Sequence, residues 1–185
     1  MHDFSHYGTY GGTACGKTHL TKKYIRTWLK HKQQVVVFAG NYDTGFPQGV
    51  DYVYDADELE AYLQDPAHYG AFVVIDEADA LFDDVGLNHP ICNNITKRGR
   101  HLGYTVWLIS QYPKSIPKRQ RRNCFERFMF LMGDWDDSVE LWKDCGKISH
   151  EGKPLSEWLM QMPKYAFFHY KHGTKELNYY PNGSP

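Results

Sequence analysis

Short apolar runs alternate with amphipathic segments along the chain. A buried parallel strand reads as a continuous apolar run, whereas a surface helix has apolar positions three and four residues apart. In residues 17–32, for example, Leu20, Tyr24 and Trp28 fall on one helical face. The pattern predicts strands over residues 4–10, 35–39, 71–77, 105–110 and 127–132, and helices over 17–32, 57–64, 88–102, 138–145 and 155–160. This alternation indicates an α/β fold, with a mainly parallel sheet and helices on both faces.

Weaker patterns occupy the remaining segments. They predict a small strand over residues 52–54, a basic and turn-like segment over 114–122, and a terminal hairpin over 165–170 and 177–180. The first strand is unusually polar for a central strand, because it contains Ser5, His6 and Thr9. We expect one domain over residues 1–185, with a core over about 4–145 and a small C-terminal extension over about 146–185.

The composition excludes several classes of protein for this chain. Hydrophobic residues make up 42% and charged residues 23% of the chain, which is typical of a globular protein. The formal net charge of −1 favours no class of partner. The four cysteines are too widely spaced for a zinc ribbon, and no histidine pair has zinc-binding spacing. No apolar run reaches transmembrane length, so we expect a soluble intracellular protein without a membrane span.

Residues 11–18 read GGTACGKT and match the P-loop (Walker A) pattern G-x-x-x-x-G-K-[ST]. Glycines let backbone N–H groups approach the phosphates of a nucleotide, and the lysine carries a positive charge to the β- and γ-phosphates. The threonine hydroxyl of this pattern binds Mg²⁺. We therefore expect ATP and Mg²⁺ to bind here, with phosphate contacts from Gly11, Gly12, Thr13, Ala14, Cys15, Gly16, Lys17 and Thr18.

Two acids end the apolar run over residues 71–77. A carboxylate at the carboxyl end of a buried strand can hold Mg²⁺ opposite Thr18, and Asp76 has this position. Glu77 is the candidate general base for the attacking water. In an alternative interpretation, these carboxylates are only solvated or pair with Lys17. Asp79, Asp83 and Asp84 follow, and we expect them in a solvated acidic loop.

Gln111 ends the strand predicted over residues 105–110. Its neutral amide is suited to hydrogen-bond the attacking water or the γ-phosphate and so to sense hydrolysis. Ser110 is a weaker candidate for the same role. Alternatively, Gln111 is simply a polar residue in the turn after a strand.

Two basic clusters are candidates for binding phosphate groups. Arginine is suited to stabilise a transferring phosphoryl group from a neighbouring subunit, and Arg98 and Arg100 in the first cluster are the candidates. Basic residues on a loop also contact the DNA backbone. The candidates for that contact are Lys114, Lys118, Arg119, Arg121 and Arg122. For both clusters, a solvated charged face remains the alternative.

The motif set resembles the FtsK–HerA superfamily of P-loop motors. The resemblance covers about residues 5–132, and the small size is similar to the genome-packaging ATPases of tailless double-stranded DNA viruses. The Gln-x-Pro segment and the Arg-His-x-Gly stretch before its strand are the more specific matches. The segments that carry the resemblance are 11–18, 72–77, 98–103, 108–113, 116–117 and 122–123.

This resemblance implies a three-layer P-loop NTPase fold of the ASCE or RecA-like type, in which the five main strands have the order 5-1-4-3-2. It implies that Asp76 organises Mg²⁺, that Glu77 activates water and that Gln111 senses the γ-phosphate. It further implies that Arg98 or Arg100 is the arginine finger that reaches into the next subunit. Proteins of this type form hexameric or pentameric rings that pass DNA through a central pore.

The function that the resemblance implies is an ATP-hydrolysing DNA translocase that packages a viral double-stranded DNA genome into a preformed capsid. Its partners would be double-stranded DNA, other copies of the chain and a capsid vertex or portal protein. Its place would be the host cytoplasm or the packaging vertex of the virion. The alternatives are a phage assembly or extrusion protein that resembles zonula occludens toxin, and a P-loop small-molecule kinase.

Overall fold

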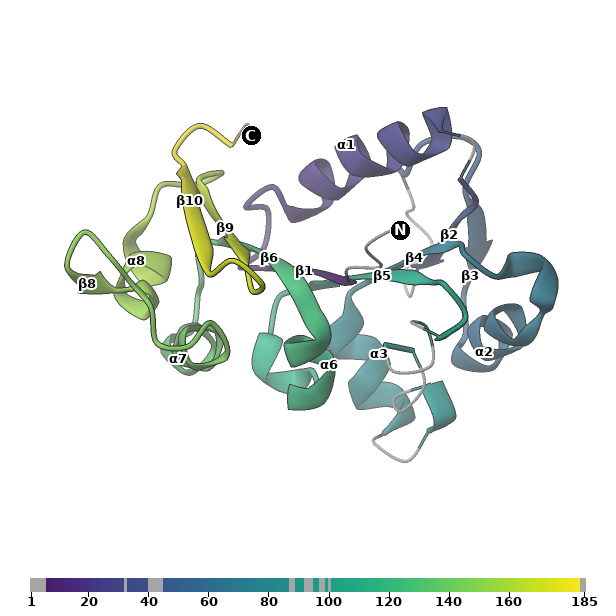
Figure 1. Ribbon diagram of the computed structural model, residues 1–185. Helices are drawn as coiled ribbons and strands as arrows, with labels where there is room; N and C mark the ends of the chain where they lie inside the picture. The colour runs from purple at the N-terminus through teal and green to yellow at the C-terminus, as the bar shows by residue number, and fades with distance from the viewer. Residues whose placement is uncertain are drawn as a thin grey trace.

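An eight-stranded sheet forms the centre of the structure, a computed structural model that describes residues 6–31, 33–39, 45–86, 89–91, 95–96, 99 and 101–183 (Figure 1). Its strands are β1 His6–Tyr10, β2 Val35–Ala39, β3 Asp51–Val53, β4 Phe72–Asp76, β5 Thr105–Ser110, β6 Cys124–Phe130, β9 Phe167–Lys171 and β10 Glu176–Tyr180. Two short strands, β7 Ser149–His150 and β8 Lys153–Pro154, form a separate antiparallel pair.

The strand order is β10-β9-β6-β1-β5-β4-β2-β3. The six strands from β6 to β3 are all parallel, and β9 and β10 add an antiparallel hairpin at the β6 edge. When the five main predicted strands are numbered along the chain, this is the order 5-1-4-3-2. The α/β P-loop NTPase fold, with its mainly parallel sheet, is therefore confirmed. The hairpin predicted in the C-terminal extension is also present.

Helices lie on both faces of the sheet. Figure 1 shows α1 on one face, and α2, α3 and α6 on the opposite face. The helices are α1 Lys17–Lys30, α2 Ala56–Gln64, α3 Ala78–Val85, α6 Lys118–Asn123, α7 Trp135–Asp144 and α8 Leu155–Gln161, with 3₁₀ turns at Pro66–His68 and Pro113–Ser115. The helix predicted over residues 88–102 falls partly on residues outside the described part of the chain.

Two predicted loops are helical in the structure. The basic segment over residues 114–122 begins in the 3₁₀ turn Pro113–Ser115, but from Lys118 onward it belongs to the helix α6, so its prediction as turn-like was wrong for residues 118–122. The acidic segment after Glu77 is helix α3 instead of a solvated loop. Asp83 and Asp84 are exposed on this helix, but Asp79 in its first turn is buried.

The polar residues of β1 have partners inside the sheet. The Trp107 indole N–H donates a 2.7 Å hydrogen bond to the Thr9 hydroxyl. The His6 ring lies between the Val106 N–H, 3.1 Å from Nδ1, and the Thr96 carbonyl, 2.9 Å from Nε2. Because each buried polar group is paired, a polar central strand is compatible with the core.

The carboxyl ends of the central strands meet at one edge of the sheet. Tyr10 at the end of β1 is paired in register with Ser110 at the end of β5. Asp76 at the end of β4 is paired with Ala39 on β2, and the neighbouring Ile75 is paired with Leu108. The segments that directly follow β1, β4 and β5 therefore emerge side by side, which is where parallel α/β sheets bind ligands.

Candidate nucleotide-binding site

The P-loop follows β1 and turns into α1, and glycine is required at both ends of this turn. A Cβ atom on Gly11 would lie 2.6 Å from the Phe130 Cβ, closer than any side chain tolerates. Gly16 has a φ of +107°, in the left-handed region that other residues rarely adopt. The loop thus presents its backbone at the amino end of α1, where the helix dipole favours an anion.

The Lys17 side chain folds back over the P-loop. Its ammonium group donates 2.7 Å hydrogen bonds to the carbonyls of Gly11 and Gly12, and the residue is only 7% exposed. Burial lowers the pKa of this lysine, and Asp76 and Glu77 partly oppose that shift. A buried cation so close to the loop backbone favours the binding of a phosphate group, which would pair directly with the Lys17 ammonium group.

Asp76 and Glu77 lie at the carboxyl end of β4, beside the P-loop. Burial raises the pKa of the Asp76 carboxyl group, and the adjacent Glu77 raises it further. A divalent cation at this position would offset both effects, because it stabilises the ionised carboxylate. The oxygen donors of Asp76 and Thr18 line one pocket and are of the type that Mg²⁺ prefers, so the residues present fit this ion.

Glu77 has a φ of +53°, in the left-handed region where residues other than glycine are uncommon. Such strain usually marks a residue that is held in place for function. Here the turn directs the chain from β4 into α3 and leaves Glu77 in the wall of the P-loop pocket.

Gln111 completes this pocket from the end of β5. Its side-chain oxygen accepts a 2.7 Å hydrogen bond from the Thr13 hydroxyl, and its backbone N–H donates to Asp79 Oδ1 at 3.3 Å. The pocket has a volume of about 200 Å³. The predicted site residues that it brings together are Thr13, Ala14, Lys17, Thr18, Asp76, Glu77 and Gln111, with Ser110 also in its wall.

Asp79, which was expected in a solvated loop, instead anchors the segment after β5 to helix α3. The sequence signal available for this role was the position of Asp79 shortly after the predicted strand that ends at Glu77. An acid in the first turn of a helix is favoured by the helix dipole, so the residues after Glu77 were compatible with a helix start. The buried carboxylate could not be recognised without knowing that β5 lies beside β4.

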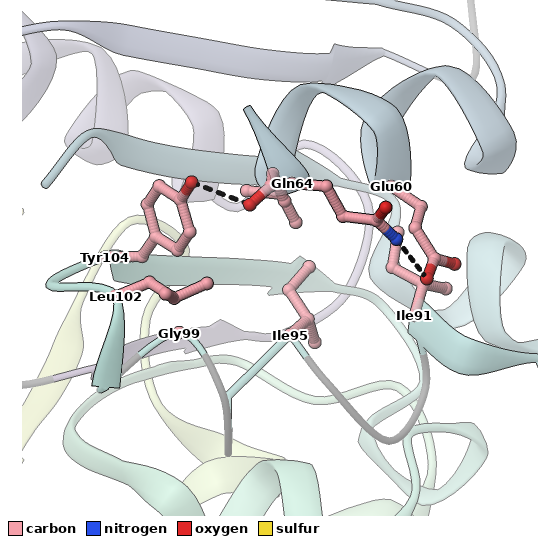
Figure 2. Close-up of a pocket in the computed structure, with 8 residues that line it drawn as sticks. Glu60, Gln64, Ile91, Ile95, Gly99, Leu102 and Tyr104 are labelled. Carbon is pink, nitrogen blue, oxygen red and sulfur yellow. Dashed lines mark hydrogen bonds between the residues drawn. The ribbon is translucent and has the colours of Figure 1, made fainter. Parts of the chain in front are cut away.

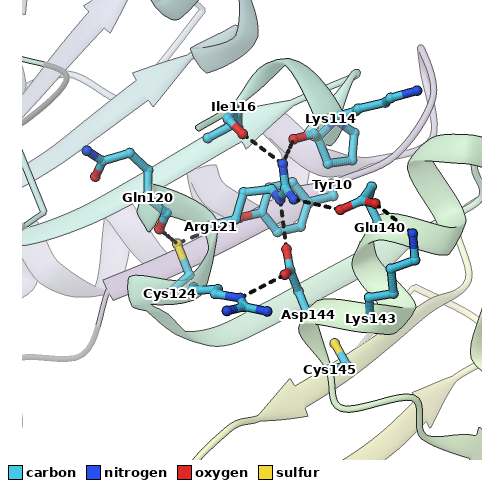
Figure 3. A network of polar contacts seen from close by, with 12 residues as sticks. Tyr10, Lys114, Ile116, Gln120, Arg121, Cys124, Glu140, Lys143, Asp144 and Cys145 are labelled. Carbon is cyan, nitrogen blue, oxygen red and sulfur yellow. Dashed lines mark hydrogen bonds and ion pairs between the residues drawn. The ribbon is translucent and has the colours of Figure 1, made fainter. Parts of the chain in front are cut away.

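The second basic cluster contains one arginine that is buried inside the protein. Figure 3 shows Arg121 at the centre of a polar network, and the residue is only 3% exposed. Its guanidinium donates to Asp144 at 2.7 Å, to Glu140 at 3.2 Å and to the carbonyls of Pro113 and Ile116. The expectation that Arg121 contacts DNA was therefore wrong, because this side chain holds α6 against α7.

The other members of this cluster differ in exposure. Arg122 donates to Asp144 at 3.3 Å, and Lys114 forms a 2.8 Å ion pair with Asp136 on the surface. Lys118 and Arg119 are exposed, and no described carboxylate lies within ion-pair distance of either. Arg98 and Arg100, the finger candidates, lie outside the described residues.

A separate apolar cavity of about 50 Å³ lies between α2 and the segment before β5 (Figure 2). Its polar groups are paired with one another. The Tyr104 hydroxyl donates to the Leu63 carbonyl at 2.8 Å, and the Gln64 amide donates to Glu60 at 3.0 Å. This cavity is too small for a nucleotide, and none of the described residues that line it carries a positive charge, so the P-loop pocket is the candidate site.

The described residues contain no group of three or more histidine, cysteine or acidic residues placed to hold a metal ion by themselves. In the same part of the chain, no helix combines the length and the apolar character needed to cross a membrane.

The fold and the P-loop geometry define the P-loop NTPase class. The sequence matches no known family model and no curated protein sequence. Among solved structures, the chain is similar to the genome-packaging NTPase B204 from Sulfolobus turreted icosahedral virus 2 in complex with ATP-gammaS, with a TM-score of 0.77 and 18% identity over 97% of this chain and 98% of that chain.

Two other solved structures broaden the comparison. The pCW3 conjugation coupling protein TcpA has a TM-score of 0.70 and 13% identity, over 96% of this chain and 60% of that chain. The N-terminal domain of zonular occludens toxin from Neisseria meningitidis has a TM-score of 0.51 and 15% identity, over 95% and 93% of the two chains. At these identities the likenesses establish the fold, and they agree with the resemblance that the sequence motifs predicted.

Proposed function

We propose that this chain is an ATP-hydrolysing DNA translocase of the FtsK–HerA superfamily, which packages a viral double-stranded DNA genome into a preformed capsid. The observation that carries the proposal is the convergence of Lys17, Glu77 and Gln111 on one pocket beside the P-loop. The similarity in fold to a genome-packaging NTPase, over nearly the whole of both chains, supports the same activity.

Each residue of the pocket has a distinct part in hydrolysis. The P-loop backbone and Lys17 bind the phosphates, and Thr18 with Asp76 would hold Mg²⁺, which neutralises charge on the phosphate oxygens when bound. The Glu77 carboxylate accepts a proton from the water that attacks the γ-phosphate. Gln111 orients this water or the γ-phosphate through its amide, while Thr13 holds the amide oxygen.

The proposal includes a ring of identical subunits around DNA, either a hexamer or a pentamer. Arg98 or Arg100 would reach the γ-phosphate in the neighbouring subunit. Lys118 and Arg119 on α6 are exposed and have no described carboxylate partner, so they would contact the DNA backbone. The ring would work in the host cytoplasm or at the packaging vertex, docked on a capsid or portal protein.

The decisive experiment is ATP hydrolysis by the purified chain with and without double-stranded DNA, with the Glu77→Gln variant as the blank. We expect DNA to stimulate hydrolysis in the wild-type protein and to have no effect in the variant. If DNA does not change the rate of ATP hydrolysis, the translocase function is contradicted and only an ATPase activity is left.

The arginine finger is tested by mixing subunits. The Arg100→Ala variant should bind ATP without hydrolysing it. Mixing it with Lys17→Ala subunits should restore part of the activity, because an intact finger then faces an intact P-loop in some pairs of neighbours. The same mixture with Arg98→Ala distinguishes the two candidates, and no recovery with either would contradict a finger that acts in trans.

A nucleotide-driven phage assembly or extrusion protein is the second candidate function. The observation in its favour is the similarity in fold to the N-terminal domain of zonular occludens toxin. Such a protein would hydrolyse ATP without stimulation by DNA, so the experiment with double-stranded DNA separates it from the translocase. For the small-molecule kinase, no described feature offers specific support.

A further inference from the structure

Charge is distributed unevenly along the chain. Residues 33–96 contain twelve acidic residues but no lysine or arginine, whereas residues 17–32 contain six lysine and arginine residues and no acidic residue. The acidic segment includes α2 and α3, and the basic segment consists largely of α1. The formal net charge of −1 therefore results from separate acidic and basic regions, not from an even mixture of charges.

The basic face of α1 consists of Lys23, Arg26 and Lys30. These residues are exposed, and their spacing of three and four positions places them on one side of the helix. None of the three forms an ion pair with a described carboxylate. Like charges at this spacing repel one another and destabilise a helix. Negative charges from outside the chain would relieve this repulsion.

The acidic face is formed by α2 and α3, which lie across the sheet from α1 (Figure 1). The Asp57 side chain on α2 is 96% exposed, and its one described ion-pair partner is His89, at 3.4 Å. No lysine or arginine pairs with an acid of either helix among the described residues. The basic helix α6 lies on the same side, but toward β6 and away from α2. The exposed residues of the acidic face are Asp57, Glu58, Asp65, Asp83 and Asp84.

The two faces cannot meet within one chain, because the sheet lies between them. Their lengths are similar: at about 1.5 Å per residue, Lys23 and Lys30 are about 10 Å apart along α1, and Asp57 and Asp65 are about 12 Å apart along α2. Each copy thus presents a positive and a negative surface of similar length on opposite sides. Contacts between unlike surfaces of identical chains run head to tail, and they close into a ring where the rotation per subunit allows it.

We propose that the basic face of α1 binds the acidic face of α2 and α3 on a second copy of the chain. The inference rests on the proposed ring and names the two surfaces that meet in it. Complementary charge favours this partner over DNA. A nucleic acid would pair with the basic face alone and would be repelled by the acidic face, whereas a second copy pairs with both.

This contact is compatible with an arginine finger that acts in trans. Gly99, between the two finger candidates, lines the cavity beneath α2 together with Glu60 and Gln64 (Figure 2). The segment around Gly99 therefore adjoins the acidic face. On the next copy, α1 begins directly after the P-loop. A contact between α2 and the α1 of that copy brings the segment around Gly99 toward the neighbouring P-loop.

Charge reversal tests the two faces by sedimentation velocity, with Mg²⁺ and a non-hydrolysable ATP analogue present. Arg26→Glu/Lys30→Glu reverses the basic face, and Asp57→Lys/Glu58→Lys reverses the acidic face. We expect the wild type to assemble at about 50 mM salt and to dissociate as the salt is raised to about 500 mM, because salt screens exposed charges. Each reversed variant should raise the dissociation constant at least about tenfold, because repulsion replaces attraction at two positions.

The matched control is Lys153→Glu/Lys175→Glu. It reverses two exposed lysines outside both faces and changes the net charge as Arg26→Glu/Lys30→Glu does, so it should assemble as the wild type does. If both reversed variants also assemble with wild-type affinity, the inference is overturned and the ring is built through other surfaces. A wild-type chain that stays monomeric at low salt would overturn the ring together with the inference. If Arg26→Glu/Lys30→Glu assembles normally but loses affinity for double-stranded DNA, the α1 face binds DNA and the inference is wrong.

Mixing the two reversed variants excludes misfolding as the cause of lost assembly. Neither variant should assemble alone. In an equimolar mixture, the two reversed faces pair with each other and the two unchanged faces do the same, so assembly should return. The chain with all four substitutions should also assemble. Because the two variants must alternate, the mixture closes only into rings with an even number of subunits, which distinguishes a hexamer from a pentamer. If neither the mixture nor the fourfold variant assembles, the two faces do not pair and the inference is overturned.

Discussion

The Thr13 hydroxyl donates a 2.7 Å hydrogen bond to the side-chain oxygen of Gln111, across a separation of 98 residues. This bond joins the P-loop to the end of β5. With its oxygen held by Thr13, Gln111 keeps its NH₂ group as a donor. In the proposed function this donor would bond an oxygen of the γ-phosphate or of water, and the state of the phosphate would be coupled to the segment that continues into α6.

We predict that the Thr13–Gln111 bond positions the sensor. Thr13→Val removes the hydroxyl at constant shape and should lower kcat about tenfold, the effect of losing one hydrogen bond of roughly 1.4 kcal/mol. Thr13→Ser keeps the donor and should retain most of the activity. Gln111→Ala should lower kcat about a hundredfold, because it removes a donor to the transition state.

Steady-state ATP hydrolysis and the dissociation constant of ATP are measured together for these three variants. ATP affinity should change little, since the P-loop backbone and Lys17 remain. If Thr13→Val and Thr13→Ser have the same kcat, the hydrogen bond has no part in catalysis.

Glu77 allows a prediction that separates stability from activity. Its φ of +53° costs a residue with a Cβ atom about 1 kcal/mol, which glycine avoids. Glu77→Gly also removes a negative charge beside Asp76. We expect this variant to unfold about 2–4 °C above the wild type while losing hydrolysis. Glu77→Ala is the control, since it removes the carboxylate but keeps the strain. Equal melting temperatures for the two variants would contradict a strained Glu77.

Much of the fold and of the nucleotide site was predictable from the sequence, because their signals are local. The P-loop pattern fixes Gly11, Gly16 and Lys17 at set spacing, and Val35–Ala39 and Thr105–Ser110 are strands with the predicted bounds. Asp76 and Glu77 were identifiable because a buried strand ends there. The strand order required the family resemblance, since the apolar pattern of a strand does not specify its neighbours.

The features that were missed depend on contacts between distant segments. The sequence 118–122 is basic at nearly every position, and nothing local indicates that Arg121 is buried against Asp144 while Arg119 is exposed. Asp79 similarly depends on the contact between α3 and the end of β5.

Asp76 gives the protein a pH dependence of known sign. Its pKa in the fold is raised above the ordinary 3.8, mainly by burial. The folded protein therefore binds this proton more tightly than the unfolded chain, and the stabilising contribution is lost as the pH rises through the folded pKa. We expect Asp76→Asn to be more stable than the wild type near neutral pH, without nucleotide or Mg²⁺, and the difference to vanish in acid.

Urea unfolding of both proteins at a series of pH values measures this difference in the free energy of unfolding, in which the other titrating groups cancel. Asp76→Asn should also lose hydrolysis that depends on Mg²⁺. A stability difference that stays constant with pH would show that the carboxyl group of Asp76 ionises as freely in the fold as in the unfolded chain.

The buried Arg121 and the exposed Lys118 and Arg119 of α6 should respond to substitution differently. Arg121→Ala leaves the fully buried Asp144 with only the longer bond to the exposed Arg122, and should cost about 3–5 kcal/mol of unfolding free energy. The double variant Lys118→Ala/Arg119→Ala should keep the wild-type melting temperature. It should bind double-stranded DNA more weakly, with a salt dependence reduced by about one unit in the log–log slope for each lost phosphate contact. Thermal unfolding and DNA titrations at several salt concentrations measure both effects. If the double variant retains the full salt slope, DNA contacts another surface, and α6 serves only to hold α7 against the sheet.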